Sequence, residues 1–82
     1  MEIVSNGINF TVDDESSVFT SDKKFVIDDG GELFYLFYNA STEYWHLDNC
    51  DGDSVESVHG NNFELDINAV EWACGLISNG DL

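Results

Sequence analysis

Histidine and cysteine are the side chains with the widest chemistry in this chain, and it has two of each: His46, Cys50, His59 and Cys74. Only His46 and Cys50, three residues apart, have the close spacing of zinc ligands, while the other two fall in a predicted turn and a predicted helix. A Cys–His pair can also serve nucleophilic catalysis, but no glycine-flanked nucleophile motif accompanies these residues. We therefore expect no catalytic residue and no zinc site, and we expect two reduced thiols rather than a disulfide framework.

A run of carboxylates from Asp48 to Glu56 resembles a calcium loop at first sight. Placing Gly52 at the sixth position of such a loop puts Leu47 and Val58 at the first and twelfth, where carboxylates are required. The EF-hand interpretation fails for that reason. An irregular divalent-cation site among Asp48, Asp51 and Asp53 stays open as an alternative to a solvated acidic turn, and we expect the turn, with no metal and no cofactor.

The composition argues against several classes of function. The 82 residues contain seventeen acidic side chains, two lysines (Lys23 and Lys24) and no arginine, which gives a net charge of −15. Phosphate-binding glycine motifs and bidentate arginine clamps are missing, and so strong a negative charge disfavours direct binding to nucleic acid. Apolar runs fall short of the roughly 18 to 20 residues that cross a bilayer, and the N-terminus lacks a basic signal-peptide region. We expect a cytoplasmic protein without a catalytic activity.

Alternating apolar residues predict strands over most of the chain. The expected strands span 7–12, 24–28, 33–38 and 43–47, with a short edge strand over 54–58. The Asp29-Gly30-Gly31 sequence predicts a tight hairpin turn, because glycine readily adopts the positive φ that such turns require. The sequence therefore predicts a run of antiparallel strands.

The C-terminal segment changes from strand to helix periodicity. Ile67, Val70, Cys74 and Ile77 recur at helical spacing, with Asp66 as a candidate N-cap and Asn79-Gly80 as a candidate stop. We predict one α+β domain over residues 1–82, an antiparallel sheet of four to five strands with one C-terminal helix packed on one face.

The strand over 33–38 is apolar on both of its faces, although one short helix covers one face of a sheet only. Unless loops or the N-terminal segment cover the second face, that face is an apolar contact surface. Full burial of a central strand is the alternative. The residues that we assign to self-association, as a homodimer, are Phe34, Leu36, Tyr38 and Trp45.

The acidic residues gather at predicted turns and strand ends, so we assign partner binding to them. They are Asp13, Asp14, Glu15, Asp28, Asp29, Glu32, Asp48, Asp51, Asp53 and Glu56. A charge of −15 spread over roughly 4,900 Å² of surface, the area expected for this mass, is about threefold sparser than the charge of B-DNA. Imitation of DNA therefore requires that the carboxylates share one surface, and the sequence does not show which turns do.

A strongly acidic small domain is attracted to basic surfaces, and basic protein surfaces commonly hold nucleic acid. In composition and size the chain resembles the phage anti-restriction and anti-CRISPR proteins, although no motif matches a particular family. This resemblance implies an inhibitor, similar to a DNA mimic, that blocks the nucleic-acid-binding site of a nuclease or another defence protein in the host cytosol. A barstar-like immunity protein or antitoxin for a nuclease toxin is the alternative. A non-catalytic structural or assembly subunit and a halophile protein with evenly spread charge are further alternatives.

Overall fold

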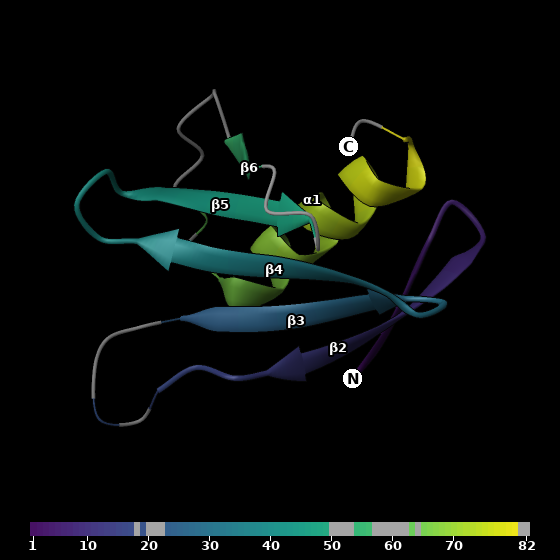
Figure 1. The fold of residues 1–82 in the computed structure, drawn as a ribbon, viewed down its shortest axis with the longest axis horizontal. Helices are drawn as coiled ribbons and strands as arrows, with labels where there is room; N and C mark the ends of the chain where they lie inside the picture. Colours follow the sequence, from purple (N-terminus) through teal and green to yellow (C-terminus); the bar gives the residue numbers. More distant parts are fainter. Residues whose placement is uncertain (18, 20–22, 50–53, 57–62, 64, 81–82) are drawn as a thin grey trace.

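The chain forms an antiparallel sheet whose strands lie in sequence order, with one helix behind it (Figure 1). The computed structural model describes residues 1–17, 19, 23–49, 54–56, 63 and 65–80, with 54–56 described through the backbone alone. The elements are β1 (Glu2–Ser5), β2 (Ile8–Asp14), β3 (Lys24–Asp29), β4 (Glu32–Asn39), β5 (Tyr44–Asn49), β6 (Ser54–Glu56) and α1 (Asp66–Ser78). The predicted α+β class, an antiparallel sheet with one C-terminal helix, is confirmed.

Two tight turns build the hairpins of the sheet. Gly30 and Gly31 join β3 to β4 with φ of 60° and 102°, and the carboxylate of Asp28 accepts a hydrogen bond from the N–H of Gly31 at 2.7 Å. This is the hairpin turn predicted from the sequence. Asn6 and Gly7 join β1 to β2 in the same way, with φ of 51° and 78°. Strand β1 is an addition to the predicted strands, and it brings the sheet to six described strands.

The hydrophobic core lies between α1 and one face of the sheet. Because side chains alternate along a strand, the residues that are paired across neighbouring strands share a face. Val12 pairs with Ile27, Ile27 with Phe34, and Leu36 with Leu47. The buried residues are Phe10, Val12, Phe25, Ile27, Phe34, Leu36, Trp45 and Leu47 on the sheet and Ala69, Val70, Ala73 and Cys74 on the helix.

This core corrects the sequence-based assignment of a self-association surface. Phe34, Leu36 and Trp45 are at most 3% exposed, and Tyr38 packs against them at the edge of the same cluster. The four residues point toward α1, so they are buried within the fold and do not form an outer surface. The face of β4 that points away from the helix carries Tyr35 and Phe37 instead.

The helix begins and ends close to the predicted positions, with one correction. The N-cap is Leu65, whose side chain makes no capping hydrogen bond, and Asp66 is the first helical residue, not the cap. Asp66 instead forms an ion pair with Lys23 at 3.0 Å. At the other end Asn79 is the C-cap and Gly80 has a φ of 74°, as the predicted stop requires. Ile67, expected in the core, is 37% exposed.

The N-terminal hairpin is tied to the C-terminal end of the helix. The side-chain amide of Asn6 donates to Ser78 Oγ at 2.8 Å and to Asn79 Oδ1 at 2.9 Å. The turn between β1 and β2 therefore closes the end of the helix–sheet layer. In the part of the chain that the structure describes, no helix has the length and apolar composition to cross a bilayer.

Candidate functional site

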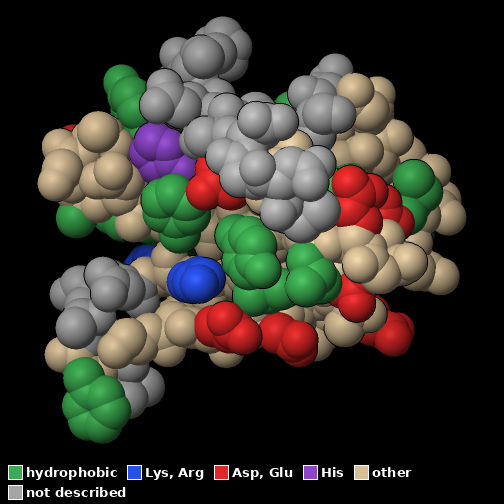
Figure 2. Space-filling view, viewed as in Figure 1, with side chains coloured by type: hydrophobic (Ala, Val, Ile, Leu, Met, Phe, Trp, Pro, Cys, Tyr) green, Lys and Arg blue, Asp and Glu red, His purple; other side chains and the backbone are tan. Residues whose placement is uncertain are grey.

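The sheet face opposite α1, here called the distal face, carries aromatic and charged side chains side by side. It consists of Asp13 on β2, Lys24, Val26 and Asp28 on β3, Leu33, Tyr35 and Phe37 on β4, and His46 and Asp48 on β5. Figure 2 looks onto this face, where hydrophobic side chains lie beside a histidine and a lysine and carboxylates lie near its margins. The distal face is therefore neither a plain solvated surface nor a second core.

Aromatic contacts organise the part of the distal face over β4 and β5. The rings of Phe37 and His46 stack with centroids 5.2 Å apart and an interplanar angle of 13°. His46 is 8% exposed, and its Nε2 lies 3.5 Å from the hydroxyl of Thr42. The ammonium of Lys24 lies 5.3 Å from the ring centroid of Tyr35. These rings therefore already attract a cation of the chain itself.

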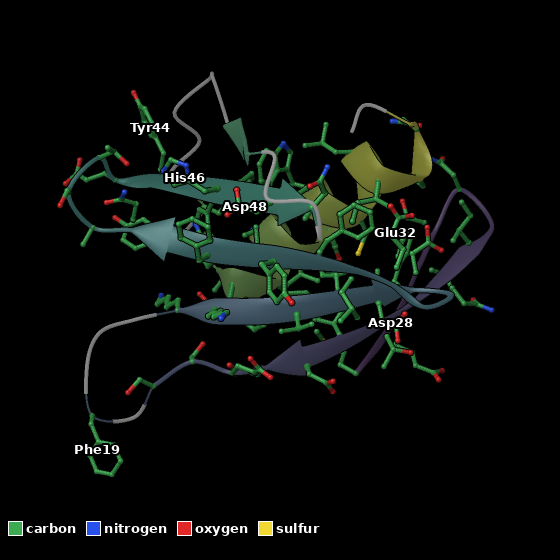
Figure 3. The ribbon with its side chains drawn as sticks, in the orientation of Figure 1. Phe19, Asp28, Glu32, Tyr44, His46 and Asp48 are labelled. Carbon is green, nitrogen blue, oxygen red and sulfur yellow. The ribbon has the colours of Figure 1, made fainter. Side chains whose placement is uncertain are left out.

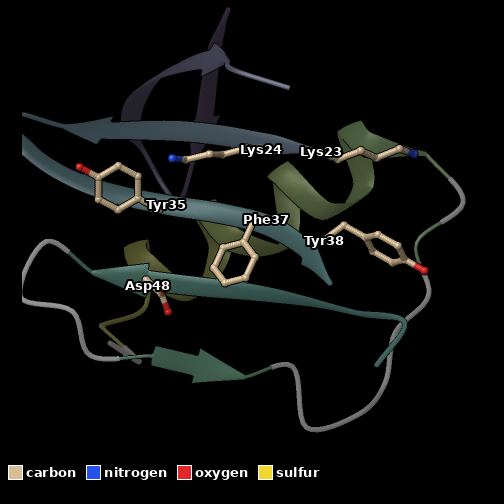
Figure 4. A pocket seen from close by; sticks show the side chains of 6 residues that line it. All are labelled: Lys23, Lys24, Tyr35, Phe37, Tyr38 and Asp48. Carbon is tan, nitrogen blue, oxygen red and sulfur yellow. The ribbon is translucent and has the colours of Figure 1, made fainter. Parts of the chain in front are cut away.

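A hollow of about 400 Å³ opens on the same face (Figure 4). Its lining residues are Lys23, Lys24, Tyr35, Phe37, Tyr38 and Asp48. Asp48 is the cross-strand neighbour of Tyr35, so its carboxylate lies beside that ring. The Oδ1 atom of Asp48 is buried, and it has no hydrogen-bond partner among the described residues. The hollow thus combines aromatic walls with a carboxylate in its lining.

The antiparallel order shows which acidic turns share an end of the sheet. Asp28 and Asp29 end β3 and Glu32 begins β4, while Asp48 lies near the end of β5, which runs parallel to β3. Asp28, Asp29 and Glu32, here called the acidic end, therefore share one end of the sheet, whereas Asp48 pairs with Tyr35 in the middle of β4; Asp28, Glu32 and Asp48 are labelled in Figure 3. Of the other residues assigned to partner binding, Asp51 and Asp53 lie outside the described residues, and Glu56 is described by its backbone in β6.

The triplet Asp13, Asp14 and Glu15 is exposed at the opposite end of the sheet, where β2 leads toward β3. Asp14 accepts a hydrogen bond from the N–H of Ser16 at 2.8 Å. Hydrogen bonds from the hydroxyl and the N–H of Ser16 lower the pKa of Asp14 below its usual value. The lowered pKa keeps the Asp14 carboxylate ionised. Because this triplet lies away from the acidic end, the acidic clusters do not all meet at one place.

The histidine and cysteine residues do not come together as far as the structure describes them. His46 lies on the distal face, while Cys74 is buried on α1 at the other side of the sheet. Cys50 and His59 lie outside the described residues. Burial, with a smaller contribution from the Glu71 carboxylate, raises the pKa of the Cys74 thiol to about 11. A buried thiol of this kind is a poor nucleophile. Among the described residues, no three His, Cys, Asp or Glu side chains form a candidate metal site.

The aromatic half of the distal face was not assigned a role from the sequence. Tyr35, Phe37 and His46 alternate with core residues, so their spacing did show that they share a face. It did not show which of the two faces the helix covers. Comparison of the chain with protein-family models, with curated proteins and with solved structures gives no match.

Proposed function

We propose that the protein is a small acidic inhibitor that occupies a basic nucleic-acid-binding surface on another protein, such as a nuclease of a defence system. One observation carries this proposal: Asp28, Asp29 and Glu32 gather where β3 turns into β4, at the end of β3 that lies away from both lysines. Lys23 and Lys24 precede and begin β3, while Asp28, Asp29 and Glu32 lie where β3 turns into β4. Five residues of extended chain place Lys24 and Asp29 about 17 Å apart along the strand.

The acidic end has no lysine or arginine of its own to neutralise it, because the chain contains only Lys23 and Lys24. Spread evenly, a charge of −15 over 5083 Å² amounts to about one charge per 340 Å². B-DNA has about one per 110 Å² if it is treated as a cylinder of about 10 Å radius. Competition with a phosphate backbone therefore depends on the locally concentrated carboxylates of the acidic end, which favours this end as the contact surface.

A basic cleft would attract this end over a distance and then release bound counterions. Association between opposite charges is fast at low salt and slows steeply as salt screens them. An inhibitor of this kind needs no catalytic group, so the proposal requires no chemistry from His46 or Cys74. The anti-restriction and anti-CRISPR class fits this physics, and an immunity protein for a nuclease toxin would use the same surface on a different partner.

The first test is capture of a partner from a nuclease-bearing host at about 0.1 M and about 1 M salt, where the Debye length falls from ~10 Å to ~3 Å. The captured nuclease is then assayed for cleavage with and without the protein. We expect capture and inhibition at the lower salt and loss of both at the higher salt. Capture that is indifferent to salt, or a bound nuclease that stays fully active, would contradict the proposal.

The second test neutralises matched pairs of carboxylates at the two ends of the sheet. Asp29→Asn with Glu32→Gln changes the acidic end, and Asp13→Asn with Glu15→Gln changes the opposite end by the same net charge. Asp28 is left intact because its carboxylate holds Gly31 in the turn. We expect the first pair to weaken inhibition about tenfold more than the second, about 1.4 kcal/mol of binding free energy. Equal losses would mean that overall charge, and not the acidic end, determines binding.

A further inference from the structure

The hollow on the distal face contains a hydrogen-bond acceptor, Asp48, that could bind a specific ligand group in addition to the general attraction between charges. The buried Oδ1 atom of Asp48 has no donor among the described residues. Asp48 also lines the hollow, so its carboxylate offers an acceptor to a ligand that carries an N–H. Asp48 therefore indicates a ligand with a hydrogen-bond donor.

The residues that line the hollow limit which hydrogen-bond donors can bind there. The rings of Tyr35 and Phe37 line it, and Asp48 is paired with Tyr35 across the two strands. An ammonium group of the chain, that of Lys24, already lies over the Tyr35 ring. A flat cation that stacks on an aromatic ring and donates to a carboxylate meets both requirements, and the arginine guanidinium is the side chain with that geometry.

The two lysines that line the hollow raise the opposite alternative, an anionic ligand. Lys23 is already paired with Asp66 at 3.0 Å, so its charge is largely neutralised locally. An incoming phosphate would approach the Asp48 carboxylate and would also face the net charge of −15. Both the local acceptor and the long-range field therefore favour a cation over an anion.

We propose that the hollow lined by Tyr35, Phe37 and Asp48 binds an arginine side chain of the basic partner, with the guanidinium against the rings and donating to the Asp48 carboxylate. This inference rests on the proposed function, because it assumes a basic protein surface as the occupant. It adds a specific pocket to a binding mode that is otherwise set by charge. Nucleic-acid-binding surfaces are rich in arginine, so such a residue would be removed from its normal phosphate partner.

The experiment titrates the isotopically labelled full chain with short capped peptides and follows the backbone amide signals of β4 and β5 by NMR. The peptides are matched: one contains glycine and arginine, the second has lysine and the third has the uncharged citrulline in place of arginine. We expect the arginine peptide to shift the signals of residues 34–38 and 46–48 and to bind about tenfold more tightly than the lysine peptide. The citrulline peptide, which keeps three of the five N–H donors of arginine but loses the charge, should bind more weakly than both.

Asp48→Asn and Asp13→Asn form the matched pair of variants. Both residues lie on the distal face and in one cross-strand row, through Val26 and Tyr35, and each substitution removes one negative charge. We expect Asp48→Asn to weaken binding of the arginine peptide about 10- to 100-fold and Asp13→Asn to change it less than about threefold. Phe37→Leu, which keeps apolar volume but removes the ring, should abolish the preference for arginine over lysine.

Four outcomes would overturn the inference. Equal effects of Asp48→Asn and Asp13→Asn would show that net charge alone determines binding. Equal binding of the arginine and lysine peptides would show that the hollow does not select arginine. Shifts of the same signals by adenosine monophosphate, without shifts by the arginine peptide, would assign the hollow to an anion. Nuclease inhibition that survives Asp48→Asn but is lost on neutralising Asp29 and Glu32 would reject the pocket while leaving the proposed function intact.

Discussion

The thiol of Cys74 is buried where α1 packs on the sheet, and its ionisation links pH to stability. Burial first, and the Glu71 carboxylate second, raise the pKa of Cys74 from 9.0 to about 11. The folded protein therefore holds this proton more tightly than the unfolded chain. The resulting stability is fully present below pH 9.0 and is lost as the pH rises toward about 11.

We predict that Cys74→Ala makes the protein less sensitive to alkaline pH. The difference in the free energy of unfolding between wild type and Cys74→Ala should fall between about pH 8 and about pH 10.5, by at most ~1.4 kcal/mol per pH unit. Urea unfolding of both proteins across this range measures the difference, and the other titrating groups, which the two proteins share, largely cancel. Parallel curves for the two proteins would show that folding does not change the pKa of the thiol.

The sequence alone predicted only part of the candidate site. The sequence correctly indicated that Phe34 and Leu36 share one face of their strand and Tyr35 and Phe37 the other. Alternation shows which residues share a face of the strand, but it does not show which of the two faces the helix covers. That depends on where α1 lies after the chain returns to the sheet. The mistaken self-association residues and the overlooked aromatic hollow follow from this one ambiguity.

At the scale of elements, the N-terminus of α1 lacks a side-chain cap. Leu65 holds the N-cap position with extended φ and ψ of −113° and 136°, but its side chain satisfies none of the free N–H groups of the first turn. The Lys23–Asp66 ion pair at this end is about half exposed on both sides, so it contributes little. A side chain with an oxygen acceptor at position 65 would correct the missing cap.

We predict that Leu65→Ser stabilises the protein by about 0.5 to 1 kcal/mol. The leucine is 60% exposed, so little apolar burial is lost with it. Leu65→Ala is the control, because it removes the same side chain without supplying an acceptor. Thermal and urea unfolding compare the two variants, and equal stabilities for serine and alanine would show that capping is not limiting at this helix end.

The elements themselves were more predictable than their faces. Strong local signals were enough for the Gly30-Gly31 turn and for the helix stop at Asn79-Gly80, because both depend on a backbone conformation that few residues adopt. Strand β1 was missed although Asn6-Gly7 is the same kind of turn signal. Its four residues, Glu2–Ser5, gain their stability from pairing with β2 and from contact with the helix end, which a local reading of the sequence does not include.

At the scale of the whole molecule, the strand order determines which charged turns lie near one another. The sequence places acidic residues at several turns, but which turns share an end depends on each strand being paired with its neighbour in sequence. The order β1 to β6 keeps Asp28, Asp29 and Glu32 at one end and brings Asp14 and Glu15 beside Lys24 at the other. The acidic end is therefore the group of carboxylates that lies away from both lysines.

The same net charge predicts opposite effects of salt on the free protein and on its complex. With a radius of gyration of 11.9 Å, most carboxylates lie within the Debye length of ~20 Å at about 0.02 M salt and beyond the ~4 Å at about 0.5 M. Raising the salt should therefore relieve self-repulsion and increase the melting temperature by about 5 °C or more, while it weakens binding to a basic partner.

Asp29→Asn with Glu32→Gln should melt higher than wild type at low salt and gain less from added salt, because part of the repulsion is already gone. Calorimetric melting in sodium chloride tests both expectations, and a melting temperature that is flat or falls with salt would mean that the carboxylates do not destabilise the fold.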